Sequence, residues 1–479
     1  YNTGTNYINI YVTSVDIPGF GDIDNDGDID ILTFDILGGF VDYYKNTSME
    51  NHGHSDSLEY IKSSDCWGLF VEPGLSNILV LDYCNANQKL SNPFTGGGYR
   101  HAGSTMLVFN PDGDSDMDIL LGDLSFNNLV YGENIPMGNI DSIATMDTLY
   151  PAYDVSADVL VFPAAFELDI DHDGKKDLMV APNANSGINS VQSSWFYKNT
   201  GTATSSVYSF VESDFLQNSM IDHGERSNPT FVDYNGDALY DLVVGNYGKY
   251  ENNDYKASLS LWENTGTATK PEFTLITDDW LSIKSMDLTD ISPAFGDLDG
   301  DGDTDLILGD ADGKLHYFEN NAGAGSPVNL VLTLPNYQGI DIGQFAKPTL
   351  YDLNNDGLLD LVIGKKTGLL SYYENKGMAS SPAFILKSDT LGMIDVKMPA
   401  YNTGYSAPHF AALDNTGEVV LLVSSQSGYV YVYDISQPLS STYSCLDTLV
   451  MYEGRNSCIS SAHLDQDSKL DMVMGAQRG

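Results

Sequence analysis

Acidic side chains recur along the 479-residue sequence in short runs at alternate positions around a glycine. Oxygen ligands at positions 1, 3, 5 and 9 of such a loop, with a backbone carbonyl at position 7, can wrap one hard cation. The two clearest copies each carry five aspartates: Asp22, Asp24, Asp26, Asp28, Asp30 and Asp297, Asp299, Asp301, Asp303, Asp305. The chemistry that this pattern indicates is cation binding.

Calcium is the cation that these loops fit best. It accepts six to eight oxygens at flexible angles, whereas magnesium demands an octahedron and keeps several waters. Softer metals prefer His or Cys, which the loops mostly lack. The EF-hand, which needs a bidentate Glu at position 12, is rejected because that position is apolar or Thr throughout: Thr33, Leu121, Val180, Val244, Leu308, Ile363 and Met474.

The same frame begins near residues 22, 110, 169, 233, 297, 352, 412 and 463. The other predicted ligands are Asn110, Asp112, Asp114, Asp116, Asp118; Asp169, Asp171, Asp173, Lys175, Asp177; Asp233, Asn235, Asp237, Asp241; Asp352, Asn354, Asp356, Asp360; and Asp465, Asp467, Asp471. The copy at 412 has lost its terminal carboxylates, so we expect it to be empty. The prediction is up to about seven structural calcium ions. The alternative, that such turns bind nothing, stays open for the weaker copies at 233 and 463.

Each frame is followed by an apolar strand and then by an aromatic strand that ends in Asn, as in 306–309 and 317–320. With an entry strand and a later strand, every unit holds four short antiparallel strands. A sheet of this size buries both faces only by packing against similar sheets around an axis. We therefore predict an all-β β-propeller of seven or eight four-stranded blades, with calcium-binding loops between the first and second strands. It forms one domain over residues 1–479, with an insertion at about 46–105.

Composition limits the class of partner. The chain carries 22 Lys and Arg against 67 Asp and Glu, a formal charge of -45, which argues against nucleic acid and anionic lipid. No apolar stretch approaches the roughly 18 residues of a membrane helix, so we expect no direct membrane insertion. Hydrophobic residues make up 42% of the chain, which excludes wholesale disorder.

The four cysteines fall into two local pairs, Cys66 with Cys84 and Cys445 with Cys458. Two disulfides would suit an exported protein. The alternative, four unpaired thiols, stays open because sequence does not show pairing.

Phe20-Gly21 and Phe295-Gly296, which precede the two clearest acidic runs, and the runs themselves resemble FG-GAP/VCBS-type repeats, the calcium-bearing blades also found in integrin α propellers. The Asn199-Thr-Gly turn and the Cys66-Trp-Gly segment look like secreted and surface proteins of Gram-negative bacteria that use type IX secretion. This resemblance implies a secreted or outer-surface location and contact with secretion machinery. The C-terminal sorting domain of such proteins is not recognisable, and flanking segments missing at both ends are one alternative to closure of the ring.

The favoured function is a non-catalytic module that binds a protein or glycan ligand, with calcium holding the loops as a rigid platform. Its expected contact region is the insertion, which carries Trp67, Phe70 and Phe94; the alternative is a loop packed on a blade edge. We expect no enzyme activity, because no Gly-x-Ser-x-Gly, His-Glu-x-x-His or Walker sequence occurs. The alternatives are a propeller scaffold of a larger secreted enzyme, such as a polysaccharide lyase or hydrolase, and a scaffold with no external ligand.

Overall fold

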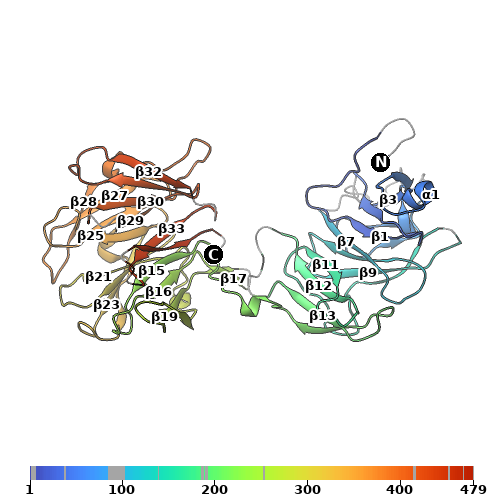
Figure 1. Ribbon diagram of the computed structural model, residues 1–479, viewed down its shortest axis with the longest axis horizontal. Helices are drawn as coiled ribbons and strands as arrows, with labels where there is room; N and C mark the ends of the chain where they lie inside the picture. The colour runs from blue at the N-terminus through green and yellow to red at the C-terminus, as the bar shows by residue number, and fades with distance from the viewer. Residues whose placement is uncertain are drawn as a thin grey trace. The chain divides into compact units, whose positions relative to one another are not determined.

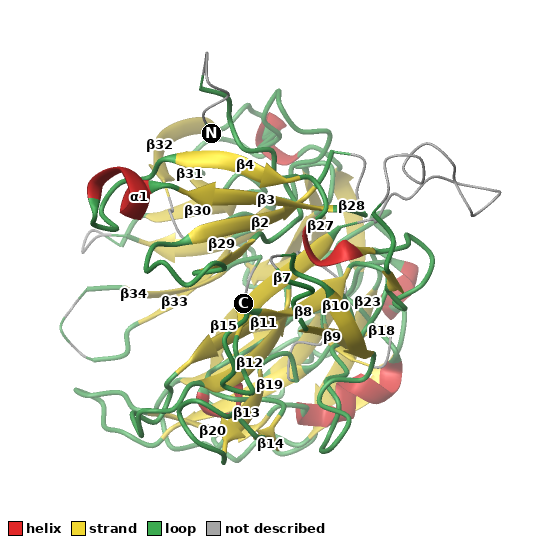
Figure 2. Cartoon of the chain, turned by 90° about the vertical axis from the view of Figure 1, so that its right-hand side faces the viewer, coloured by secondary structure: helices red, strands yellow, loops and turns green. Residues whose placement is uncertain are grey.

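The computed structural model describes residues 1, 7–36, 39–84, 103–138, 140–184, 188, 192–251, 254–413, 417–450, 454–465, 467 and 469–477. Its contacts group the chain into two compact units, Tyr1–Ile221 and Asp222–Gly479 (Figure 1). Strands and loops make up most of both units, and the helices are short (Figure 2). The chain is therefore all-β, as its sequence predicts.

The described residues of unit 1 form three four-stranded antiparallel sheets, each in sequential strand order. They are β1 (Gly19–Gly21), β2 (Asp30–Phe34), β3 (Val41–Asn46), β4 (Tyr60–Ser64); β7 (Ser104–Phe109), β8 (Asp118–Asp123), β9 (Leu129–Asn134), β10 (Ile143–Asp147); and β11 (Pro163–Leu168), β12 (Asp177–Pro182), β13 (Trp195–Asn199), β14 (Tyr208–Glu212). A short ribbon, β5 (Phe70–Val71) and β6 (Val80–Leu81), follows the first sheet. The helical turns are α1 (Ser48–His52), η1 (Trp67–Leu69) and η2 (Gln217–Ser219).

In unit 2, the part of the chain that the structure describes forms four more four-stranded antiparallel sheets. They are β15 (Asn228–Val232), β16 (Asp241–Gly245), β19 (Leu259–Asn264), β20 (Phe273–Thr277); β21 (Ser292–Gly296), β22 (Asp305–Gly309), β23 (Leu315–Asn320), β24 (Leu330–Leu334); β25 (Lys347–Tyr351), β26 (Asp360–Gly364), β27 (Leu370–Asn375), β28 (Phe384–Ser388); and β29 (Ala407–Ala412), β30 (Val419–Ser424), β31 (Tyr429–Asp434), β32 (Ser444–Val450). The described residues of unit 2 also form two ribbons, β17 (Lys249–Glu251) with β18 (Asp254–Lys256) and β33 (Cys458–Ala462) with β34 (Asp471–Gly475), and the turns η3 (Trp280–Met286), η4 (Tyr337–Gly339) and η5 (Leu391–Met393).

The sequence pattern explains the position of each strand. The second strands are continuous apolar runs, and β22 is buried on both faces, with Leu306, Ile307 and Leu308 fully buried. Such a strand must be covered by other sheets on both sides. The first strands of the four sheets in unit 2 carry proline at their second residue, which suits an edge strand because proline donates no ladder hydrogen bond: Pro229, Pro293, Pro348 and Pro408.

The first strands of unit 2 contact one another in a cyclic order. β15 contacts β21 and β33, β21 contacts β25, β25 contacts β29, and β29 contacts β33. These five strands line a cavity of about 270 Å³. Hydrophobic clusters lie between the faces of neighbouring sheets; one joins Ile307 and Leu315 to Leu361 and Ile363 of the next sheet.

The prediction of four-stranded antiparallel sheets is confirmed for seven described sheets, whereas the loop at 463 joins the two described strands β33 and β34. Each acidic run lies between the first and second strands of its sheet. One ring of seven or eight blades is not confirmed, because the contacts form two units and the described sheets are all open. The single domain over residues 1–479 stays a prediction. The aspartate of the degenerate loop, Asp414, lies outside the described residues.

Candidate metal centres

The first aspartate of each well-formed loop folds the turn. Asp22 accepts backbone hydrogen bonds from Asp26 and Gly27, both at 3.0 Å. Asp169 makes the same pair of contacts in its loop, with Asp173 and Gly174 at 3.0 Å. Gly27 has φ +98°, a conformation that favours glycine, so the glycine at position 6 permits this tight turn.

The ninth residue of the frame is an aspartate buried at the start of the second strand. Asp305 is fully buried; its Oδ1 accepts the backbone N–H of Asn320 at 2.8 Å and its Oδ2 that of Leu298 at 3.0 Å. Asp177 and Asp360 repeat this arrangement with Asn199 and Asn375 on their third strands. The ninth aspartate therefore ties the loop to the second and third strands.

Burial disfavours the charged form of these ninth carboxylates. It raises the pKa of Asp30 and Asp305 to about 6 and that of Asp118 to about 7. Burial also raises the pKa of Asp241 to about 6 and that of Asp360 above its ordinary value. A bound cation would favour the deprotonated form that the fold alone disfavours.

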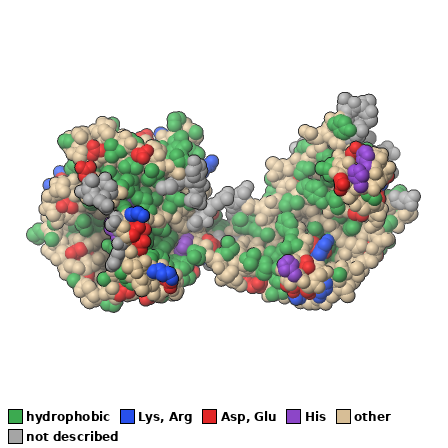
Figure 3. All heavy atoms as spheres, in the orientation of Figure 1, with side chains coloured by type: hydrophobic (Ala, Val, Ile, Leu, Met, Phe, Trp, Pro, Cys, Tyr) green, Lys and Arg blue, Asp and Glu red, His purple; other side chains and the backbone are tan. Residues whose placement is uncertain are grey.

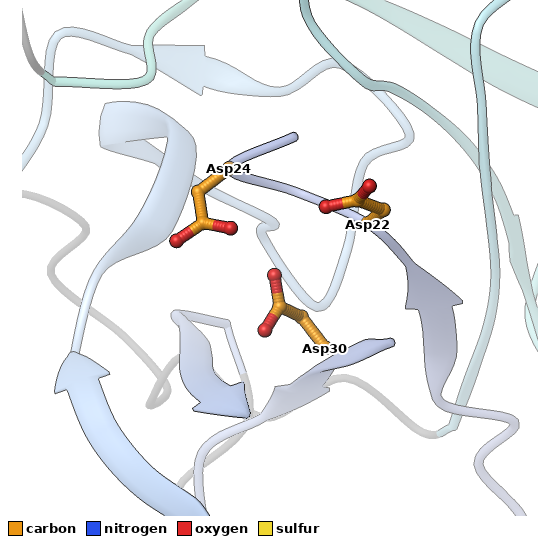
Figure 4. Close-up of side chains that lie close together, drawn as sticks. All are labelled: Asp22, Asp24 and Asp30. Atoms are coloured by element: carbon orange, nitrogen blue, oxygen red, sulfur yellow. The ribbon is translucent and has the colours of Figure 1, made fainter. Parts of the chain in front are cut away.

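Three loops bring carboxylates from separate positions of the frame to one point. Oxygens of Asp22, Asp24 and Asp30 all lie within 4.8 Å of one another, and Figure 4 shows the three side chains pointing into a common space. Two further loops each hold a group that meets the same criterion: Asp169, Asp171, Asp177 and Asp297, Asp299, Asp301. These three loops are the best candidate metal centres.

Among the described residues, the loops at 110, 233, 352 and 463 do not bring three carboxylates this close. Two of them carry Asn in place of Asp at position 3, Asn235 and Asn354, and each Asn Nδ2 donates to the Asp at position 5. The predicted ligands of these four loops stay predictions: Asn110, Asp112, Asp114, Asp116, Asp118, Asp233, Asn235, Asp237, Asp241, Asp352, Asn354, Asp356, Asp360, Asp465, Asp467 and Asp471.

Several buried carboxylate oxygens have no hydrogen-bond donor. They include one oxygen each of Asp26, Asp28, Asp116 and Asp303. A buried anionic oxygen without a donor is costly, and hard oxygens are the ligands that calcium prefers. The donor set therefore fits calcium.

Lysines near two of the loops were not predicted as partners. Lys45 forms ion pairs with Asp24 and Glu50, and Lys198 forms one with Asp171. Both lysines directly precede the Asn that ends the third strand, and this Lys-Asn pair is visible in the sequence. Lys175, predicted to offer its carbonyl, also places its Nζ 3.1 Å from Asp173.

The two predicted disulfides have different outcomes. Cys66 and Cys84 form a disulfide, with Cα atoms 6.1 Å apart. Cys445 and Cys458 are free, so the second predicted bridge is wrong. Cys445 is exposed on β32, whereas Cys458 lines the cavity of unit 2.

The insertion does not present its aromatic side chains as predicted. Trp67 and Phe70 are only 2% and 0% exposed, and both pack in the first core of unit 1. They support the alternative of a packed loop. Phe94 lies outside the described residues.

A hollow of about 310 Å³ lies between the neighbouring loops at 233 and 297. It is lined by Asp233, Tyr240, Phe295, Asp303 and Asn320, among others. Tyr240 is 47% exposed. Acidic side chains lie in small scattered groups on the face drawn in Figure 3. No described helix has the length and apolar character needed to cross a membrane.

The cavity of unit 2 contains a hydroxyl and an imidazole in contact. His409 Nε2 lies 2.7 Å from Ser461 Oγ. Burial lowers the pKa of His409 to about 4. The absence of enzyme activity stays a prediction.

A family model for the FG-GAP-like repeat matches residues 233–308 and 297–363. The resemblance to this repeat is thus confirmed for that part of unit 2. No curated protein matches the chain.

Solved structures match at low identity. A lectin from Agrocybe aegerita that recognises non-reducing terminal N-acetylglucosamine is 15% identical over 97% of this chain and 100% of its own, with a TM-score of 0.28. BBS1N in complex with ARL6DN is 12% identical over 65% of this chain and 75% of its own, with a TM-score of 0.25. Sqt1 from Saccharomyces cerevisiae is 11% identical over 98% of this chain and 95% of its own, with a TM-score of 0.24. These TM-scores are too low to carry an argument.

Proposed function

We propose that the chain is a secreted or cell-surface, non-catalytic binding module whose loops are held by calcium and whose ligand is a protein or a glycan. The observation that carries the proposal is the convergence of carboxylates in three copies of one repeated loop. Calcium in these loops would be structural, because each lies between two strands of a sheet. Export by type IX secretion is part of the proposal.

The hollow between the loops at 233 and 297 is the proposed contact region. Tyr240 and Phe295 offer apolar ring surface, and Thr304 and Ser326 offer hydroxyl groups beside it. Rings beside a few polar groups suit a sugar or a peptide side chain. Because both adjoining loops carry the acidic frame, calcium would fix the walls of this hollow.

Arrays of glycans and of surface proteins, probed with the full chain in calcium and in chelator, test the proposal. We expect retention of a ligand in calcium, loss in chelator, and loss in the Tyr240→Ala variant. Leu216→Ala, which changes an exposed side chain in unit 1, is the matched control and should bind like wild type. Binding that is equal in calcium and chelator would contradict the calcium-dependent platform.

A further inference from the structure

The loop that begins at Asp22 gathers more negative charge than one calcium ion balances. Glu50, on helix α1, joins the five aspartates of the loop. Oxygens of Asp24, Asp26 and Glu50 lie within 4.8 Å of one another, a group separate from that of Asp22, Asp24 and Asp30. Asp24 belongs to both groups.

A buried carboxylate faces this second group. Asp28 is fully buried; its Oδ2 accepts the backbone N–H of Met49 at 2.9 Å, and its Oδ1 has no donor. Met49 directly precedes Glu50 in helix α1, and the backbone N–H of Asp28 donates to Asp26 Oδ1 at 3.1 Å, so Asp28 adjoins both Asp26 and Glu50. Asp26 Oδ2 is also buried without a hydrogen bond, 3.5 Å from the ammonium of Lys45.

The loop at 169 shows what one ion would balance. Its four aspartates, Asp169, Asp171, Asp173 and Asp177, are accompanied by Lys175 and Lys198, so the local charge is -4 + 2 = -2. One calcium ion would neutralise it. The Asp22 loop has six carboxylates and Lys45, giving -6 + 1 = -5. One ion leaves -3 there, and two ions leave -1.

The seventh residue of the frame accounts for part of the difference in net charge between these two loops. Where it is lysine, its ammonium reaches the carboxylate at position 5: Lys175 lies 3.1 Å from Asp173, and Lys469 lies 3.5 Å from Asp467. In the Asp22 loop the seventh residue is Asp28, so the protein supplies a second carboxylate where those loops supply a cation.

We propose that the Asp22 loop binds a second divalent cation through Asp24, Asp26, Asp28 and Glu50, beside the ion expected at Asp22, Asp24 and Asp30. The inference rests on calcium binding by the loops. Calcium suits the site because it accepts carboxylates in irregular arrangements. Asp24 bridges the two ions, and Lys45, which bridges Asp24 and Glu50 in the structure, moves aside when the second ion binds.

Equilibrium dialysis of the full chain against radioactive calcium tests the inference. Glu50→Gln should bind one ion fewer than wild type, or bind its weakest ion at least tenfold more weakly. Asp28→Leu, which installs the residue type of Leu239 and Leu358 at position 7, should show the same loss. Lys45→Met should bind the weakest ion about tenfold more tightly, because it removes the competing ammonium.

Glu59→Gln is the matched control, since Glu59 is exposed and pairs with His52 on the same helical turn. It should bind as wild type does. If Glu50→Gln and wild type bind the same number of ions with equal affinity, the second site is refuted while calcium binding by the loops stands. If wild type binds no calcium, both ideas fail. Glu50 is 43% exposed in its side chain, so its replacement leaves the core unchanged.

Discussion

Replacement of Asp305 by Asn separates a metal ligand from a purely structural side chain. Asp305 is fully buried and accepts the N–H groups of Leu298 and Asn320. Burial raises its pKa to about 6 from an ordinary 3.8, so ionisation at neutral pH costs the fold roughly 3 kcal/mol. Asparagine removes the cost of ionisation, but it has one acceptor oxygen fewer than aspartate. One buried backbone N–H then loses its acceptor, which costs about 1–3 kcal/mol.

The two effects of Asp305→Asn nearly cancel, so we expect the free energy of unfolding in chelator to change by less than ~2 kcal/mol. In calcium at a hundred times its dissociation constant, each bound ion stabilises the folded state by about 2.7 kcal/mol. The variant loses the contribution of that loop. The calcium-dependent part of its stability should therefore fall by about 3 kcal/mol.

Denaturant unfolding of both proteins, in chelator and in calcium, measures this difference. Asp287→Asn is the control, because Asp287 is exposed and lies outside the acidic loops. It should unfold like wild type under both conditions. If Asp305→Asn loses the same stability with and without calcium, Asp305 only ties strands together, and the reasoning is refuted.

Three further predictions concern other parts of the structure. Burial lowers the pKa of His409 to about 4, so as pH falls from about 6.5 the unfolded chain takes up a proton at this residue before the folded chain does. Protonation of the unfolded chain therefore lowers the free energy of unfolding between about pH 6.5 and pH 4. His409→Gln should reduce this pH dependence by up to ~3 kcal/mol, whereas His54→Gln, which changes an exposed histidine, should not. Cys66→Ser opens a bridge that closes an 18-residue separation and should lower the stability of unit 1 by about 3 kcal/mol in denaturant unfolding, whereas Cys445→Ser should not. Asp290 is fully buried between Arg226 and Lys347. Asp290→Asn should lower the free energy of unfolding by roughly 3–5 kcal/mol in the same denaturant measurement. A decrease below ~1 kcal/mol would contradict a buried ion pair at this position.

The repeated loop and its sheets could be predicted because both signals are local. Alternation of Asp around Gly marks the loop, and the apolar and aromatic runs that follow it mark β22 and β23. The spacing of the frame alone also predicts that Asp22, Asp24 and Asp30 converge on one point, as their oxygens do. Short-range spacing therefore sufficed for the loop and for the strands beside it.

Long-range contacts could not be predicted in the same way. Glu50 joins the Asp22 loop through helix α1, which has no counterpart in the other described repeats. Cys445 and Cys458 are near in sequence, but one lies on an exposed last strand and the other on a first strand that lines a cavity. Similar sheets can also pack on one another in many orders, so the repeat did not show that the chain would form two units.

The double role of the ninth aspartate was missed for a related reason. Its hydrogen bonds to Asn46 in one sheet and to Asn320 in another depend on how the second strand lies beside the third. The sequence shows that both residues recur, at a variable separation. Strand pairing is what joins them.

The number of calcium ions bound by the full wild-type chain tests the central claim most directly. Atomic emission analysis after dialysis in calcium should find at least three ions per chain, one for each loop whose carboxylates converge. Their removal should lower the melting temperature. Fewer than one ion per chain at saturating calcium would contradict the claim that these loops are calcium sites.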